Sequence, residues 1–226
     1  MKSFQPFELE HVMSLYEHKV AHNLTGSGAH PLKVGELINT PELTKHLLDT
    51  ELGYPECNGS RLLREEIASL YPGATSENVL VTVGCAEANF ISLQTLVAPG
   101  EEIAVMVPNY LQVWGLAPNL GIIRKEFRLR EEHNWMLDSA ELSEAVNPNT
   151  KLIAICNPNN PTGHILSQQE MDEIIRAASR VGAWILADET YAGAERTTDV
   201  ITPSFWGKYD KVLATASLSK AFGLPG

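Results

Sequence analysis

Short apolar runs alternate with amphipathic segments along most of this 226-residue chain, and this alternation constrains the fold more than any other feature. The runs are rich in Val, Ile, Leu and Ala, as strands buried on both faces are. The segments that we expect to be strands are Val79–Val83, Ile103–Val107, Ile122–Phe127, Leu152–Ile155, Ala183–Ala187 and Val212–Thr215. Strands separated by helices predict a mainly parallel sheet covered on both faces, which is a three-layer α/β/α fold.

Apolar residues at helical spacing predict the segments that cover this sheet. Ser167 followed by Glu170 also forms a capping-box pattern at the start of one of them. The expected helices are Glu8–His22, Pro41–Leu48, Ser60–Leu70, Ala88–Val97, Leu111–Asn119, Ser139–Val146 and Ser167–Val181.

The charge and composition exclude several classes of function. A net charge of −11 argues against binding to nucleic acid or to anionic membranes. The start of the chain has no apolar stretch of the signal-peptide type, and no run approaches the length of a membrane span. Cys57, Cys85 and Cys156 form no close pair, which suggests no metal site and fits a reducing cytoplasm. We therefore expect a cytoplasmic protein.

The first candidate for chemistry is Lys220, which stands among Ser, Ala and Gly shortly after the strand-like run Val212–Thr215. We expect the strand to bring this lysine to a turn that a flat ligand can reach. There its amine could form an imine with an aldehyde. Any surface loop can carry a lysine, so this pattern needs support from other motifs.

Two further motifs follow expected strands. Cys156–Gly163 contains two Asn-Pro pairs, which favour extended or turn backbone where a strand ends, and Asn160 can offer an amide there. Asp188 ends another apolar run, with Tyr191 three residues on. Ligands bind at the carboxyl edge of open α/β sheets, and a carboxylate there needs a partner such as a protonated ring nitrogen. Ordinary turn chemistry and a helix-capping aspartate are the alternatives.

A fourth motif joins Val79–Val83 to a helical pattern through Gly84. The backbone N–H groups of Cys85, Ala86 and Glu87 would then lie at a helix N-terminus, which is a ready site for phosphate. An ordinary turn between a strand and a helix explains the same residues.

Taken together and in this order, the motifs resemble the fold-type I pyridoxal-phosphate enzymes, specifically the class I/II aminotransferase family. The matching segments are the Asn-Pro-Asn-Asn-Pro-Thr-Gly loop, Asp188-Glu-Thr-Tyr191 and Ser217-Leu-Ser-Lys220. Upstream, Leu52-Gly-Tyr-Pro55 and the segment from Gly59 to Ala68 also resemble the family, and the likeness extends from about Leu24 to Gly226.

The resemblance assigns roles around pyridoxal 5′-phosphate. Lys220 would hold the cofactor as an imine and later move the substrate's α-proton. Asp188 would keep the ring nitrogen protonated, so that the ring can take up electrons. Asn160 and Tyr191 would hydrogen-bond the ring's phenolic oxygen, and Tyr110 would stack on the ring unless it is an ordinary core aromatic.

The resemblance also implies a phosphate site and a substrate site. Ser217 and the amides of Cys85, Ala86 and Glu87 would hold the phosphate. Tyr54 would reach the phosphate of a neighbouring subunit, which implies a homodimer with shared active sites. For the substrate, Ser27, Gly28 and Asn160 are the candidates, and the expected reaction moves an amino group between an amino acid and a 2-oxo acid.

The family pattern continues beyond the Gly-Leu-Pro-Gly turn, to one arginine for the phosphate and a second that clamps the substrate carboxylate. This sequence ends before both, so we expect an N-terminal arm and substrate segment at 1–45 and an incomplete large cofactor-binding domain at 46–226, without the small C-terminal domain. In the family's sheet a later strand lies beside the first one. Without it, Val79–Val83 would lose a pairing neighbour.

Three functions remain open at this point. The first is an aminotransferase. The second is another reaction on the same cofactor, such as elimination, decarboxylation or a cyclising replacement. The third is a non-enzymatic regulator domain related to aminotransferases, which would need a basic DNA-binding domain that the acidic N-terminus does not offer.

Overall fold

A parallel five-stranded sheet forms the centre of the protein, with strand order β2-β1-β3-β4-β5. The computed structural model describes residues 4–196 and 198–225. The strands are β1 (Glu102–Val107), β2 (Ile123–Arg128), β3 (Thr150–Cys156), β4 (Trp184–Asp188) and β5 (Val212–Thr215). The α/β fold predicted from the alternating pattern is therefore confirmed.

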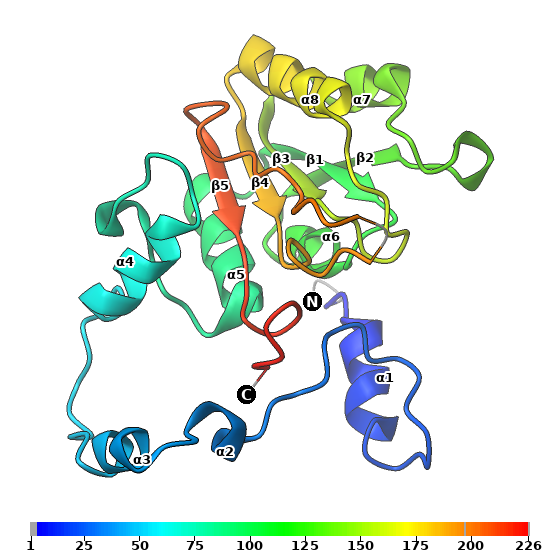
Figure 1. Ribbon diagram of the computed structural model, residues 1–226. Coiled ribbons are helices and arrows are strands. Elements are labelled where there is room, and N and C mark those ends of the chain that lie inside the picture. Colours follow the sequence, from blue (N-terminus) through cyan, green and yellow to red (C-terminus); the bar gives the residue numbers. More distant parts are fainter. Residues whose placement is uncertain (1–3, 197, 226) are drawn as a thin grey trace.

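Helices cover both faces of this sheet (Figure 1). The α-helices are α1 (Glu8–Tyr16), α2 (Val34–Leu37), α3 (Pro41–Leu48), α4 (Arg61–Ser69), α5 (Gly84–Leu96), α6 (Gln112–Asn119), α7 (Ser139–Ala145) and α8 (Gln168–Val181), and the short 3-10 helices are η1 (Ser76–Asn78) and η2 (Glu131–His133). Helices α7 and α8 pack on one face and α5 and α6 on the other, which gives the three layers.

Two hydrophobic cores explain why the strands read as continuous apolar runs. On β3, Ile153 and Ile155 pack into the core beneath α7 and α8, whereas Leu152 and Ala154 pack into the core beneath α5 and α6. Successive side chains of a strand point to opposite faces, so a strand covered on both faces needs apolar residues at every position. Burying each leucine or isoleucine side chain of this strand contributes roughly 1.5–3 kcal/mol.

The segment Val79–Val83, predicted as a strand of this sheet, is not a strand in the structure. Val83 is largely exposed, and the backbone N–H of Val81 donates to the carbonyl of Asn58 at 3.0 Å. The physical reason is that a strand needs a neighbour for its backbone groups. β5 is the outermost strand on this side of the described sheet, and its free edge does not pair with Val79–Val83.

Other boundaries differ from the expectation by smaller amounts. α5 begins at Gly84 rather than Ala88, because Gly84 adopts a left-handed φ of 70° that glycine tolerates and that turns the chain into the helix. α1 ends at Tyr16 rather than His22, and α2 was not expected at all. The capping box formed by Ser167 and Glu170 at the start of α8 is confirmed.

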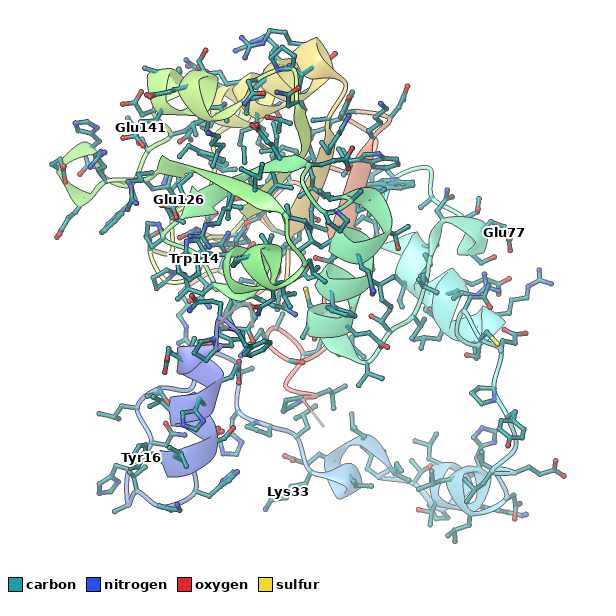
Figure 2. The ribbon with its side chains drawn as sticks, turned by 180° about the vertical axis from the view of Figure 1, so that it is seen from behind. Tyr16, Lys33, Glu77, Trp114, Glu126 and Glu141 are labelled. Carbon is teal, nitrogen blue, oxygen red and sulfur yellow. The ribbon has the colours of Figure 1, made fainter. Side chains whose placement is uncertain are left out.

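Helices α2 and α3 of the N-terminal part lie away from the sheet. Figure 1 shows α2 and α3 at the end of the molecule opposite α7 and α8, and Figure 2 shows Tyr16 and Lys33 well apart from Trp114 and Glu126. No helix of the described residues is long and apolar enough to cross a membrane. Residues 1–3, 197 and 226 lie outside the described residues. They belong to the two regions, 1–45 and 46–226, that we expected from the sequence.

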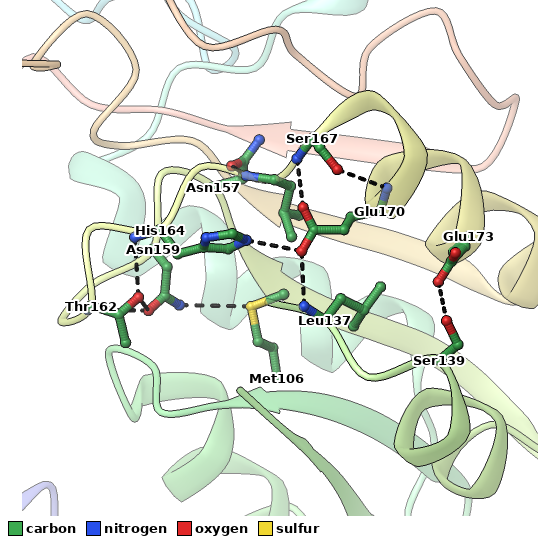
Figure 3. A network of polar contacts seen from close by, with 11 residues as sticks. Met106, Leu137, Ser139, Asn157, Asn159, Thr162, His164, Ser167, Glu170 and Glu173 are labelled. Carbon is green, nitrogen blue, oxygen red and sulfur yellow. Dashed lines mark hydrogen bonds and ion pairs between the residues drawn. The ribbon is translucent and has the colours of Figure 1, made fainter. Parts of the chain in front are cut away.

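A largely buried network of hydrogen bonds fixes the loop that follows β3 (Figure 3). The carboxylate of Glu170 accepts hydrogen bonds from the backbone N–H groups of Leu137 at 2.8 Å and Ser167 at 2.7 Å, and it pairs with His164 Nε2 at 2.9 Å. Burial disfavours the charge on Glu170, but these donors outweigh it and lower the pKa of Glu170. The network therefore joins the Asn-Pro loop, α8 and the segment before α7.

Replacing Glu170 with Gln should destabilise the fold by about 1–3 kcal/mol near neutral pH, since an amide N–H₂ would then face a backbone donor. The pKa of Glu170 is lowered in the folded state, so its stabilising charge is present above the ordinary glutamate pKa and is lost as the pH falls through the folded pKa. In urea unfolding, the stability gap between the wild type and E170Q should be present at about pH 7 and should narrow as the pH falls below the ordinary glutamate pKa. The control is D172N, also on α8, where the half-buried carboxylate accepts a hydrogen bond only from the local Gln168 side chain among the described residues. A gap for E170Q that does not change with pH would contradict the account.

Candidate active site

The carboxylate of Asp188 occupies the carboxyl edge of the sheet, where β4 ends. Its Oδ1 accepts a hydrogen bond from the backbone N–H of Thr190 at 3.1 Å, and its Oδ2 accepts one from Asn89 Nδ2 at 3.1 Å. No lysine, arginine or histidine of residues 4–196 and 198–225 forms an ion pair with it. A half-buried carboxylate held by neutral donors suits a cationic ligand group.

A small cavity opens beside Asp188, as expected for the ligand edge of an open α/β sheet. Its lining includes Tyr110, Gln112, Asn89 and Asp188. The ring of Tyr110 meets Phe7 edge-on with centroids 5.2 Å apart, and its hydroxyl donates to Glu10 of α1. Burial, followed by this hydrogen bond, raises the pKa of Tyr110 above its ordinary value. The structure therefore brings Tyr110 to the same cavity as Asp188.

Lys220 lies in the turn that follows β5, next to the N-terminal substrate segment. Its Nζ is 3.4 Å from Ser27 Oγ, which is in turn 2.7 Å from the hydroxyl of Tyr191. Lys220 Nζ also lies 6.0 Å from the centre of the Tyr191 ring. Burial raises the pKa of Tyr191, and the hydrogen bond with Ser27 partly opposes this shift. Ser27, Tyr191 and Lys220 thus form one polar group, although Ser27 precedes Lys220 by 193 residues.

Gly28 allows this close approach. The backbone N–H of Ala29 donates to the carbonyl of Lys220 at 2.8 Å. A Cβ at Gly28 would lie 3.2 Å from the carbonyl oxygen of Ser219 and 3.3 Å from Lys220 Cδ, which is tighter than ordinary van der Waals contact. Glycine at this position therefore lets the N-terminal segment lie flat against the lysine turn.

The first turn of α5 contains Cys85, Ala86 and Glu87, as the sequence predicted. The carboxylate of Glu87 accepts a hydrogen bond from the backbone N–H of Val83, so a phosphate bound there would face a negative charge. Cys85 Sγ donates to Thr215 Oγ1 at 3.3 Å, and burial, followed by the charge of Asp188, raises the pKa of its thiol to about 12. Cys85 is therefore a neutral, inert packing residue.

Three predicted site residues do not join these groups. Tyr54 is fully exposed. Ser217 bonds locally to Ser219, with the two hydroxyl oxygens 2.6 Å apart. The side chain of Asn160 has no hydrogen-bond partner among the residues that the structure describes, and its neighbour Asn159 holds the loop instead by donating to the carbonyl of Pro108 at 3.2 Å.

The sequence reasoning missed the residues that lie next to Asp188 on the side of the protein interior. They are Asn89 on α5, Gln112 at the start of α6 and Thr215 at the end of β5. Asn89 follows Cys85 by one helical turn, so its position on the buried face of α5 was a usable signal. The contacts with Gln112 and Thr215 join elements far apart in sequence and left no local pattern.

The profile of the family described as aminotransferase class I and II matches residues 27–226. The chain belongs to this family. Among curated relatives, tyrosine aminotransferase of Bos taurus is 32% identical over 87% of this chain and 46% of its own length. Histidinol-phosphate aminotransferase of Salmonella choleraesuis is 29% identical over 96% of this chain and 58% of its own length. The chain spans about half the length of such relatives.

Solved structures agree with this family membership. A PLP-dependent aminotransferase from Streptococcus suis superposes with a TM-score of 0.90 and 33% identity, over 98% of this chain and 60% of its own. The PLP-dependent cyclase OrfR superposes with a TM-score of 0.85 and 25% identity, over 100% of this chain and 59% of its own. The Thermus thermophilus aspartate aminotransferase shares the fold at 20% identity and a TM-score of 0.83, over 100% of this chain and 60% of its own.

Glu189, the residue after Asp188, is a buried carboxylate in this aminotransferase-family chain. It is 4% exposed, and its Oε1 accepts hydrogen bonds from Phe205 N at 2.8 Å and Ser204 Oγ at 3.0 Å. These bonds favour the charged form, but burial prevails and raises the pKa of Glu189 to about 7, with a smaller contribution from the charge of Asp188. Glu189 therefore takes up a proton near neutral pH.

This shift predicts that E189Q gains stability relative to the wild type as the pH rises from about 5 to about 8. The folded pKa lies above the unfolded one, so the folded wild type binds more protons and loses stability as the pH rises through this range. Gln keeps an oxygen for Phe205 and Ser204 and carries no charge to bury. Thermal unfolding of both proteins, with E144Q on the exposed face of α7 as control, measures the effect. Parallel melting curves across this pH range would show that Glu189 stays ionised.

Proposed function

We propose that this chain binds pyridoxal 5′-phosphate and forms the cofactor-binding part of an aminotransferase, which moves an amino group between an amino acid and a 2-oxo acid. The observation that carries the proposal is the pair of neighbouring strand ends at β4 and β5. Asp188 pairs in register with Thr215, and Lys220 follows five residues later. A carboxylate without a cation and a lysine in a polar turn thus come from adjacent strands.

The residues present fit this cofactor. The uncompensated carboxylate of Asp188 suits a protonated ring nitrogen, and the amine of Lys220 suits an aldehyde. The amides of Cys85, Ala86 and Glu87 at the start of α5 suit a phosphate, once the Glu87 side chain releases the N–H of Val83. The likeness to the Streptococcus suis enzyme, at 33% identity over 98% of this chain, supports the same cofactor here.

Each side chain then has a distinct task. When bound, pyridoxal phosphate supplies a ring that takes up the electrons released at the substrate's α-carbon. Lys220 would hold the cofactor covalently through Nζ, and its amine, once free, would accept and return the α-proton. Asp188 keeps the ring nitrogen protonated. Tyr191 and Asn160 would donate hydrogen bonds to the ring's phenolic oxygen, and Tyr110 would pack against the ring.

Substrate and partner contacts extend the proposal. Ser27 and Gly28, which lie against Lys220, and Asn160 would contact the substrate. Ser217 would contribute to the phosphate site, and the fully exposed Tyr54 is free to reach the phosphate of a second subunit. We therefore propose a homodimer with shared active sites, made of subunits with an N-terminal arm at 1–45 and a cofactor-binding domain at 46–226, acting in the cytoplasm.

The test of the proposal is covalent attachment at Lys220. Sodium borohydride reduces the carbon–nitrogen double bond between lysine and cofactor and makes the attachment permanent. Peptide mapping of the reduced protein should find the label on Lys220, and K220A should carry none and show no turnover. K211A, which removes a lysine just before the other end of β5, should be labelled like the wild type. A label on any other lysine would overturn the assignment.

A second test concerns Asp188. D188N should keep the cofactor attached, because Lys220 is intact, but should lower kcat by about a thousandfold, or roughly 4 kcal/mol. A neutral amide cannot hold a proton on the ring nitrogen. The measurement is kcat with a matched amino donor and 2-oxo acid, and acceptor-independent product would indicate elimination or cyclisation instead. Near-normal turnover in D188N would mean that Asp188 serves only to accept the hydrogen bond from the backbone N–H of Thr190.

A further inference from the structure

The amide of Asn89 lies directly behind Asp188, on the buried face of α5. Asn89 is 2% exposed, and its Nδ2 donates to Asp188 Oδ2 at 3.1 Å and to Gln112 Oε1 at 3.3 Å. Its Oδ1 accepts a hydrogen bond from Thr215 Oγ1 at 3.0 Å. Both N–H groups and the carbonyl oxygen of this side chain are therefore satisfied inside the protein.

The neighbours of Asn89 determine which way its amide points. If the amide were turned over, its oxygen would face both the carboxylate of Asp188 and the carbonyl oxygen of Gln112, and acceptors would meet acceptors. The observed orientation avoids this. Gln112 is itself fixed, because its Nε2 donates to the carbonyl of Ala86 at 2.7 Å. Asn89 can therefore present only a donor to Asp188.

A chain of hydrogen bonds runs toward Asp188 from behind. Cys85 Sγ donates to Thr215 Oγ1, Thr215 donates to Asn89 Oδ1, and Asn89 donates to Asp188. These residues come from α5, β5 and the end of β4, so three elements are tied at one point. Every donor in this chain is neutral. A lysine or arginine in place of Asn89 would cancel the charge of Asp188, whereas an amide orients the carboxylate and leaves its charge available.

We propose that Asn89 is the positioning residue for Asp188: its amide fixes the rotation of the carboxylate, so that the charge is aimed at the ring nitrogen of the bound cofactor. This inference rests on the proposed function, because it concerns the same site. The competing interpretation is that Asn89 only satisfies a polar gap beneath the helix, and then its loss would weaken the fold without changing what Asp188 recognises.

A comparison of two cofactors separates these interpretations. The probes are pyridoxal phosphate and its analogue in which carbon replaces the ring nitrogen, each titrated into the cofactor-free protein and followed by tryptophan fluorescence. Both have the aldehyde and the phosphate, so the ratio of their dissociation constants reports only the contact at the ring nitrogen. The wild type should prefer pyridoxal phosphate by on the order of tenfold or more, because a charge-assisted hydrogen bond forms only with that ring.

The decisive variant is N89L, which keeps the number and branching of the side-chain heavy atoms and removes the amide. Its preference for pyridoxal phosphate should fall by about fivefold or more, whatever happens to the two affinities. T215V removes the hydroxyl that holds Asn89 Oδ1 and should lower the preference in the same direction by less. S92A is the control, since Ser92 is also on α5 and its hydroxyl donates to the carbonyl of Ala88 within the same helix, away from Asp188. Circular dichroism checks that each variant folds. If N89L does not fold, the preference of T215V for pyridoxal phosphate over the analogue is the deciding measurement.

The outcomes are distinct. Equal losses of both affinities in N89L, with the preference unchanged, would overturn the positioning role. A wild type that binds both probes without preference would overturn it as well, while leaving cofactor attachment at Lys220 intact. A wild type that binds neither probe would overturn the proposed function and this inference with it.

Discussion

The constraint on which the site depends is a carboxylate that the protein orients but does not neutralise. Asp188 ends a strand buried on both faces, where an isolated charge is costly to keep. Hydrogen bonds from Thr190 and Asn89 reduce that cost while leaving the charge in place. The protein therefore maintains a negative potential at the cavity, and a ligand with a cationic ring atom gains the interaction that the chain itself does not supply.

The packing of strands and helices, rather than the loops, determines which polar residues surround Asp188. β4 and β5 are parallel and in register, so Asp188 and Thr215 end side by side. α5 packs beneath the same strands through Leu93 and brings Asn89 to Asp188. The lysine turn instead depends on the N-terminal segment, since Ala29 bonds to Lys220 and Leu32 bonds to Gly223. The two halves of the site thus have different supports, one rigid and buried, the other held by main-chain contacts at the surface.

Local sequence patterns predicted those parts of the protein that local physics determines. The strand Val212–Thr215 and the helix Pro41–Leu48 have the expected bounds, because apolar runs and a Thr40 cap followed by proline define them within a few residues. The strand predicted at Val79–Val83 was wrong, because an apolar run forms a strand only where a neighbouring strand pairs with its backbone. The grouping of Asp188 with Asn89, and of Ser27 with Lys220, depends on chain packing across 99 and 193 residues. No local pattern could indicate it, and only the family resemblance pointed to Ser27.

The two neighbouring carboxylates at the end of β4 show how the fold assigns different chemistry to adjacent residues. Successive side chains leave a strand in opposite directions, so Asp188 faces the cavity while Glu189 turns toward Ser204 and Phe205. Two charges so close would repel each other, and the buried one takes up a proton most readily because it has less water around it. The pKa of Glu189, raised to about 7 mainly by its burial, is consistent with this division. A proton on Glu189 removes a like charge beside Asp188 and thereby helps to preserve the negative potential at the cavity.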